Sequence, residues 1–217
     1  MLDPLLRPFI DPPLNRLGNG LAGLGVTPNA VTLIGLGLGL AAAVAIVLGA
    51  LVIAAGLIVL SRLADGLDGA VARTAGRSDF GGYLDITCDF LFYGAIPLAF
   101  VLIDPAANGA AGAFLLASFY FNGATFLGYA ALAERRGLRS ARHGSKSLYF
   151  TGGLLEGTET ILFFLVLCLW PQHFAPLAWV FGALCILTGV SRVLLARQVF
   201  ADNHDARPEA GRERIGD

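Results

Sequence analysis

Residues 51–73 read LVIAAGLIVLSRLADGLDGAVAR, an apolar run that passes into acids, arginines and small residues. The first half of this run is apolar enough to enter a bilayer. The second half carries four charged residues: Arg62, Asp65, Asp68 and Arg73. Ionisable residues inside a membrane span are costly and usually mark a functional site. The stretch therefore predicts a membrane helix whose last turns carry chemistry.

Six apolar stretches are spread over the chain, which has 217 residues, 56% of them hydrophobic and only 14% charged. A soluble domain carries about 25% charged residues, so lipid is the expected solvent. Each stretch approaches the roughly 20 residues that a helix needs to cross a bilayer core. The predicted spans are 30–49, 51–72, 82–102, 107–132, 149–169 and 175–196.

The N-terminal segment is expected to lie at the membrane surface, because it combines apolar residues with Arg7 and Arg16. The apolar residues are Leu2, Leu5, Leu6, Phe9 and Ile10. Prolines interrupt it at positions 4, 8, 12 and 13, so no continuous apolar region typical of a signal peptide follows Met1. The predicted fold class is an all-α membrane protein with six transmembrane helices preceded by this short interfacial segment. Its predicted parts are a juxtamembrane segment (1–29), a six-helix domain (30–200) and a polar, disordered tail (201–217).

The fifteen Lys and Arg residues predict the orientation. All of them lie in, or at span ends facing, the N-terminus, the second-to-third connection, the fourth-to-fifth connection and the C-terminal tail. The other three connections carry none. The positive-inside rule therefore places both termini and the acidic residues in the cytoplasm of a multi-pass cell-membrane protein.

Glycines recur at positions 35, 37 and 39 of the first span. No strand precedes them, which argues against a nucleotide-binding glycine loop. Small residues in a membrane helix instead favour close helix packing.

Four aspartates form the strongest functional pattern. Asp65 and Asp68 share one face of their helix, and Asp85 and Asp89, four residues apart, share a face of the next. The short connection allows the two acidic faces to oppose each other. Because four adjacent carboxylates repel unless cations lie between them, the pattern predicts Mg²⁺ or Mn²⁺, which favour oxygen ligands. Two such ions could clamp a pyrophosphate.

Small and basic residues accompany the acids. Gly69 and Ala72 leave space on the acidic face, and Arg73, one turn beyond Gly69, can reach a phosphate oxygen. Metal ligands, space and a cation together predict a nucleotide-diphosphate site.

The run from Asp65 to Asp89 resembles the signature of the CDP-alcohol phosphatidyltransferases, D-x2-D-G-x2-A-R-x8-G-x3-D-x3-D. The matching residues are Asp65, Asp68, Gly69, Ala72, Arg73, Gly81, Asp85 and Asp89. The likeness extends to six spans and to Thr27-Pro28-Asn29 at the start of the first span. Seven residues, not eight, separate Arg73 from Gly81, which leaves both acid pairs intact but alters the loop that includes Ser78.

This resemblance implies a role for each residue. The implied metal ligands are Asp65, Asp68, Asp85 and Asp89, and Asp89 is also the implied general base. The implied CDP-lipid contacts are Asn29, Ala30, Val31, Thr32, Gly69, Arg73 and Ser78. The implied reaction is attack of a small alcohol or phosphorylated alcohol on CDP-diacylglycerol, or a related CDP-lipid, with release of CMP. Family members are commonly homodimers in membrane lipid, and no nucleic acid partner is expected.

Three further groups allow two interpretations each. Glu156, Glu159 and Arg192 either form a buried ion-pair group or line the acceptor pocket. His143 and Lys146, with the arginines near them, are either positive-inside charges or hold an acceptor phosphate. Arg62, on the acidic face, is interpreted as a counter-charge rather than a ligand.

Two other functions are weighed against the enzyme. A transporter whose carboxylates line a cation pathway would distribute its acids through the membrane depth. Here four acids lie at one depth, and only Glu156 and Glu159 lie elsewhere in the spans. An inactive scaffold of the same fold would have lost a signature acid, and none is lost.

Overall fold

The computed structural model describes residues 3–137, 155 and 157–201, and these residues fold almost entirely into helices. The elements in chain order are α1 (Asp3–Gly23), α2 (Pro28–Val47), α3 (Leu51–Ala75), α4 (Asp79–Ile103), α5 (Pro105–Arg135), α7 (Gly157–Leu169), the short 3₁₀ helix η2 (Pro171–His173) and α8 (Phe174–Ala201). The part of the chain that the structure describes contains no strand. The predicted all-α class is confirmed.

Side-chain caps determine where several helices begin. The side chains of Thr27, Ser78 and Asp104 each accept a hydrogen bond from a backbone N–H three residues on, at 3.3, 3.0 and 3.0 Å. Such bonds satisfy donors that the first turn of a helix leaves free. At the other end of α3, Gly76 has φ of 105°, a conformation that favours glycine. Only three residues, 76–78, join α3 and α4, which confirms the short connection that the sequence predicted.

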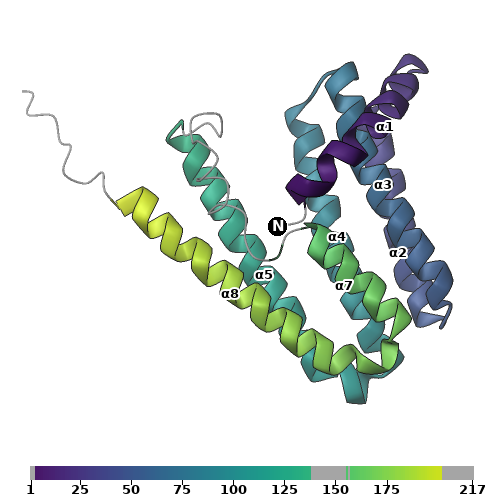
Figure 1. Cartoon of the computed structure of the whole chain (residues 1–217), viewed down its shortest axis with the longest axis vertical. Helices are drawn as coiled ribbons and strands as arrows, with labels where there is room; N and C mark the ends of the chain where they lie inside the picture. The colour runs from purple at the N-terminus through teal and green to yellow at the C-terminus, as the bar shows by residue number, and fades with distance from the viewer. Residues whose placement is uncertain (1–2, 138–154, 156, 202–217) are drawn as a thin grey trace, which may run out of the picture.

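The helices form two groups that meet at one end of the molecule (Figure 1). Helix α2 packs against both α3 and α4, while α1 and α7 pack against α3. Helices α5 and α8 pack along each other and diverge from the first group toward their far ends.

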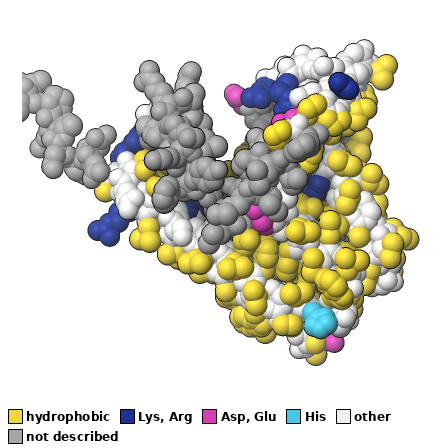
Figure 2. Space-filling view, in the orientation of Figure 1, with side chains coloured by type: hydrophobic (Ala, Val, Ile, Leu, Met, Phe, Trp, Pro, Cys, Tyr) yellow, Lys and Arg dark blue, Asp and Glu magenta, His cyan; other side chains and the backbone are white. Residues whose placement is uncertain are grey.

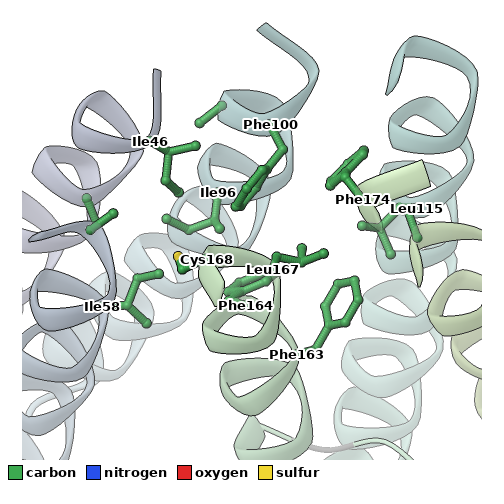
Figure 3. Close-up of a cluster of buried hydrophobic side chains, with 14 of the residues drawn as sticks. Ile46, Ile58, Ile96, Phe100, Leu115, Phe163, Phe164, Leu167, Cys168 and Phe174 are labelled. Carbon is green, nitrogen blue, oxygen red and sulfur yellow. The ribbon is translucent and has the colours of Figure 1, made fainter. Parts of the chain in front are cut away.

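Aromatic residues fill the core where the groups meet (Figure 3). The rings of Phe92 on α4 and Phe164 on α7 lie 5.9 Å apart, and those of Phe100 and Phe174 stack at 5.4 Å. All four side chains are fully buried. Burial of such large side chains contributes most of the packing energy of a core.

Two of the three glycines in α2 act as the sequence predicted. A Cβ on Gly35 would lie 3.3 Å from the Cβ of Ala64, and one on Gly39 would lie 2.5 Å from the Phe92 ring. These positions let α3 and α4 approach α2 closely. The prediction is wrong for Gly37, because no described atom outside its own stretch of helix lies within 4 Å of its Cβ position.

The N-terminal segment forms a single helix despite its prolines. Pro8, Pro12 and Pro13 lie inside the continuous helix α1. Proline removes hydrogen bonds from a helix interior, and packing of α1 on α3 offsets this loss. Gly18 is in direct contact with Ala70, where a Cβ would lie 2.6 Å from the alanine Cβ.

Among the described residues, four helices are long and apolar enough to cross a membrane: α2, α4, α5 and the η2–α8 unit. Helix α3 is not among them because its second half carries too many charges, and the described part of α7, with 13 residues, is too short.

Large hydrophobic side chains are exposed on several helices, including Val52 at 87% and Val180 at 62%. Figure 2 shows this apolar surface over the lower part of the molecule, where few charged side chains are seen, whereas several Lys and Arg side chains lie at the top and at the left. The predicted fifth span, 149–169, is described only at residue 155 and from the start of α7 onward. The predicted tail beyond Ala201 lies outside the described residues.

Candidate metal and nucleotide site

Three carboxylates of the acidic motif, from two helices, lie close together. Asp65 and Asp68 come from α3 and Asp85 comes from α4, and each offers an oxygen within 4.8 Å of the other two. Asp68 is buried, whereas Asp65 and Asp85 are partly buried. The Gly76 turn creates this arrangement because it reverses the chain directly after the acidic turns of α3. We call these three residues the acidic triad.

The donor set of the acidic triad fits a hard divalent cation. Carboxylate oxygens are ligands that Mg²⁺ and Mn²⁺ prefer. One such ion spans roughly 4.2 Å between opposite oxygens at about 2.1 Å per bond. Since the oxygens lie within 4.8 Å of one another, small side-chain movements would close them around an ion.

Asp89 lies beside the acidic triad and is paired with an arginine. Its Oδ1 accepts a hydrogen bond of 2.6 Å from the Nη1 group of Arg62, and the same nitrogen lies 3.5 Å from Oδ1 of Asp65. Arg62 thus links Asp89 to the acidic triad. This contact agrees with the interpretation of Arg62 as a counter-charge.

A threonine of α2 fixes one oxygen of the acidic triad. The Thr32 hydroxyl lies 2.5 Å from Oδ2 of Asp68 and donates to it, and both residues are buried. Thr32 was predicted as a nucleotide contact. The structure adds that it orients a carboxylate, in the way that outer-shell partners orient metal ligands.

A cavity of about 410 Å³ opens next to the acidic triad. This volume is in the range of small-molecule sites. Its walls come from the start of α2, the end of α3, the turn and the start of α4: Thr27, Pro28, Asn29, Thr32, Asp68, Gly69, Ala72, Arg73, Gly76, Arg77, Ser78, Gly81, Gly82 and Asp85.

Most residues predicted to bind the CDP-lipid line this cavity. They are Asn29, Thr32, Gly69, Arg73 and Ser78. Ala30 and Val31 are not among its lining residues, since Ala30 is exposed on α2 and Val31 is buried in the helix packing.

The shortened signature loop still places Ser78 at the cavity. Its hydroxyl caps α4 by accepting from the N–H of Gly81. A Cβ on Gly81 would lie 3.0 Å from the Ser78 Oγ and 3.1 Å from the Asn29 Oδ1. Glycine at this position therefore lets the polar groups of α2 and of the turn approach each other.

Arg73 is held by a residue that sequence reasoning missed. Its Nη2 and Nε donate to the side-chain oxygen of Asn15 on α1, at 2.7 and 3.2 Å. One turn further along α1, Asn19 Oδ1 accepts a hydrogen bond of 2.6 Å from the hydroxyl of Thr74, the residue after Arg73. The only available signal was two asparagines four residues apart in the N-terminal segment, one helical turn. Helix α1 thus borders the site.

The second polar group lies between α5 and α8. Arg192 is buried, and its Nη1 donates to the backbone and side-chain oxygens of Asn122 and to the Thr125 hydroxyl, at 2.9 to 3.0 Å. Glu159 lies near the start of α7. Glu156, His143 and Lys146, with Arg139 and Arg142, lie outside the described residues. The choice between ion-pair group and acceptor pocket therefore stays a prediction.

Fold and site together define a class: a helical integral membrane protein with an oxygen-rich acidic centre beside a polar cavity. The sequence profile of the CDP-alcohol phosphatidyltransferases matches residues 25–194, and this chain belongs to that family. It is therefore an enzyme of phospholipid biosynthesis, and the alternative of a cation transporter is set aside.

Two relatives extend the comparison. The chain is 46% identical over 193 residues to the inner membrane protein YnjF of Escherichia coli, a match that covers 89% of this chain and 94% of the relative. It is 40% identical over 87 residues to the archaetidylinositol phosphate synthase of Pyrococcus horikoshii, covering 40% of this chain and 46% of that protein.

Solved structures of one enzyme share the fold. The Mycobacterium tuberculosis phosphatidylinositol phosphate synthase in complex with manganese and citrate has a TM-score of 0.67 and 26% identity, and the match covers 83% of this chain and 87% of that one. The same enzyme with CDP-DAG bound has a TM-score of 0.68 at 24% identity, covering 94% and 98%. The second likeness shows the fold alone.

Proposed function

We propose that this protein transfers a phosphatidyl group from CDP-diacylglycerol, or a related CDP-lipid, to an alcohol and releases CMP. The observation that carries the proposal is the acidic triad at the edge of a cavity that also contains Gly69 and Arg73. Family membership supports the reaction class. The manganese complex of the related synthase supports a divalent cation.

Asp65, Asp68 and Asp85 would hold the cation, and Thr32 would keep Asp68 oriented toward it. When bound, a divalent cation neutralises pyrophosphate charge and stabilises the entering and leaving oxygens. Asp89, the fourth predicted ligand, would join them if its carboxylate turned from Arg62 toward the acidic triad.

The cavity would hold the nucleotide side of the donor. Arg73 is anchored by Asn15 and is available to donate to phosphate oxygens. Gly69 has no side chain, and the atom nearest to its Cβ position is Nη1 of Arg73 at 3.5 Å. A phosphate could therefore approach the α3 backbone beside this guanidinium.

Asp89 would act as the general base. The acceptor oxygen forms a bond to the lipid-side phosphorus, its proton passes to the Asp89 carboxylate, and the bond between that phosphorus and the CMP oxygen breaks. A positioned base of this kind contributes roughly 10²- to 10⁴-fold to a rate. Asp89 is 30% exposed in its side chain, so an acceptor can reach it.

We further propose six spans, formed by α2, α3, α4, α5, the segment containing α7, and α8. Both termini and the site would face the cytoplasm of the cell membrane, because the basic residues lie on that side of the predicted topology. The six-helix domain at 30–200 and a homodimer stay predictions.

The test is CMP release by purified protein supplied with CDP-diacylglycerol, Mg²⁺ or Mn²⁺, and a panel of acceptors. The panel contains glycerol 3-phosphate, serine, inositol, inositol phosphate and ethanolamine. We expect acceptor-dependent CMP release. Absence of release with every acceptor, from protein that binds Mn²⁺, would contradict the proposed transfer with these substrates.

Asp89→Asn tests the base. We expect turnover to fall by at least about 100-fold, because the amide cannot take the proton, while CDP-lipid binding persists. Asp104→Asn is the matched control, since Asp104 caps α5 away from the site and asparagine caps equally well. Normal turnover of Asp89→Asn would show that the base is assigned wrongly.

A further inference from the structure

We propose that Asn15 on α1 is a positioning residue for the CDP-lipid, because it orients the guanidinium of Arg73 beside the cavity. This inference rests on the proposed function, in which Arg73 donates to a phosphate oxygen of the donor. Helix α1 ends at Gly23, before residue 25, where the match to the family profile begins. The inference therefore gives a role in substrate binding to a segment that the family match leaves out.

The hydrogen bonds of Asn15 fix one edge of the guanidinium. The Asn15 Oδ1 atom accepts from Nη2 of Arg73 at 2.7 Å and from Nε at 3.2 Å. Because the guanidinium is planar and rigid, two bonds along one edge determine where its remaining nitrogen lies. That nitrogen, Nη1, lies 3.5 Å from the Cβ position of Gly69. Asn15 thereby holds Nη1 beside a glycine that lines the cavity.

Arg73 keeps the donors and the charge that a phosphate needs. An arginine carries five N–H donors, and Asn15 occupies one on Nε and one on Nη2. The Nη1 group forms no hydrogen bond with a described residue. Asn15 is also neutral, so it anchors Arg73 without cancelling its charge. A phosphate can therefore bind to Arg73 without displacing Asn15.

Without Asn15 the guanidinium would lose this anchor. Arg73 lies in the last turn of α3, is exposed, and forms no ion pair with a described residue. A long exposed side chain samples many rotamers, and ordering it when a ligand binds costs affinity. A side chain that Asn15 has already ordered avoids this cost. We therefore expect Asn15 to act on the affinity for the substrate.

Close packing of α1 on α3 determines where Asn15 lies. The Cβ position of Gly18 is 2.6 Å from the Cβ of Ala70, and the Cβ position of Gly66 is 2.8 Å from Cδ1 of Leu14. The first contact uses a glycine of α1 and the second a glycine of α3, so the helices approach closely at residues that flank Asn15 in the sequence. The position of Asn15 thus follows from helix packing and not only from its bond to an exposed side chain.

A second asparagine provides an internal comparison. Asn19, one turn after Asn15, accepts a hydrogen bond of 2.6 Å from the Thr74 hydroxyl. It also joins α1 to α3, but Thr74 is not among the residues that line the cavity. If the asparagines only held the helices together, loss of either would have the same kind of effect. If Asn15 positions Arg73, only the loss of Asn15 should weaken binding of the CDP-lipid.

The experiment compares wild type with Asn15→Ala and its matched control Asn19→Ala, each as the full-length chain in detergent. Both changes remove one amide from the same helix and raise its helix propensity equally. KM and kcat for CDP-diacylglycerol are measured from CMP release, its Kd in the presence of Mn²⁺ by calorimetry, and Mn²⁺ affinity without substrate. For Asn15→Ala we expect KM and Kd to rise roughly five- to tenfold, the cost of ordering one long side chain, while kcat and Mn²⁺ affinity stay unchanged. Asn19→Ala should alter none of these quantities.

Combination with Arg73→Lys tests whether Asn15 acts through Arg73. A lysine has one side-chain nitrogen, so it cannot bond to Asn15 and place a second nitrogen beside Gly69. Asn15→Ala should therefore raise KM by less than about twofold in the Arg73→Lys background. A rise as large as in the wild-type background would mean that Asn15 acts independently of Arg73, and the inference would be wrong.

An unchanged KM in folded Asn15→Ala, or an equal rise in Asn19→Ala, would likewise overturn it. Should Asn15→Ala not fold, Asn15→Leu, which also lacks the accepting oxygen, takes its place with Asn19→Leu as the control. Failure of the proposed function looks different, because wild type would then bind CDP-diacylglycerol without releasing CMP. The calorimetric comparison of the two variants still decides the role of Asn15 in that case, since it needs no turnover.

Discussion

Two arginines enter the helical packing, and the regions around them differ. Arg62 in the α1–α4 region contacts two carboxylates next to a cavity. Arg192 in the α5–α8 region donates to the oxygens of Asn122 and Thr125 and lies over the Phe126 ring. The α1–α4 region thus concentrates opposite charges at one place, whereas the described contacts of Arg192 on α5 go to neutral groups.

The comparison distinguishes residues that surround a ligand site from residues that hold helices together. The groups around Arg62 surround space that a ligand can enter. The hydrogen bonds of Arg192 join α5 to α8, which pack along their length and diverge from the other helices. Changes near Arg62 should therefore affect metal binding and turnover first, whereas changes near Arg192 should affect stability first.

The largest effect is expected from Asp85→Asn, which removes one anionic ligand of the acidic triad. Changes in outer-shell partners of a metal cost roughly 10- to 100-fold, and loss of a ligand should exceed this in both Mn²⁺ affinity and CMP release. Asp79→Asn is the control, since Asp79 is exposed at the start of the same helix. Retained Mn²⁺ affinity in Asp85→Asn would remove Asp85 from the metal site.

Thr32→Val should have the next largest effect. The change keeps the shape of the side chain but removes the hydroxyl that lies 2.5 Å from Asp68. We expect turnover to fall about 10- to 100-fold with an accompanying loss of Mn²⁺ affinity. Thr32→Ser keeps the hydroxyl and should restore most of both. Equal losses in the two variants would show that the hydroxyl is not the cause.

The two regions also differ in how much of them could be predicted from the sequence, because contacts in the first are local along the chain and contacts in the second are not. Asp65 and Asp68 lie within one helical turn, and Asp85 follows after a three-residue connection, so helical geometry alone brings them close. The caps at Thr27 and Ser78 are equally local. The described partners of Arg192 lie 67 to 70 residues away, and no spacing rule predicts which oxygen of another helix an arginine meets.

The place of helix α1 could not be predicted for a related reason. Its packing on α3 depends on Gly18 and Asn15 facing residues more than fifty positions away. The prolines of this segment disfavour a helix interior locally, and they give no information about that packing. Only the pairing of Asn15 and Asn19, one turn apart, gave an indication that this segment has a polar face directed at the site.

Arg192→Gln tests the α5–α8 region. Loss of several buried hydrogen bonds should reduce the free energy of unfolding by roughly 3 kcal/mol, measured as a lower Tm in detergent, while Mn²⁺ affinity stays at the wild-type value. A raised KM for the acceptor at unchanged Tm would instead favour the acceptor-pocket interpretation of Arg192 and Glu159.

The smallest effect is expected where α1 meets α3. In Gly18→Ala, the new Cβ would lie 2.6 Å from the Ala70 Cβ and 2.9 Å from its carbonyl carbon, so a backbone must move. Overpacking of this kind costs about 1–2 kcal/mol. Gly20→Ala is the matched change in the same helix, with no described atom within 4 Å of its Cβ position outside its own stretch of helix, and should be neutral or slightly stabilising.

This pair also tests whether α1 serves the site. Because Asn15 holds Arg73, displacement of α1 by Gly18→Ala should raise KM for the CDP-lipid and leave Mn²⁺ affinity unchanged. Gly20→Ala should alter neither. A lower Tm for Gly18→Ala without any change in KM would mean that α1 contributes to stability alone, and Arg73 would then need no help from Asn15 to bind phosphate.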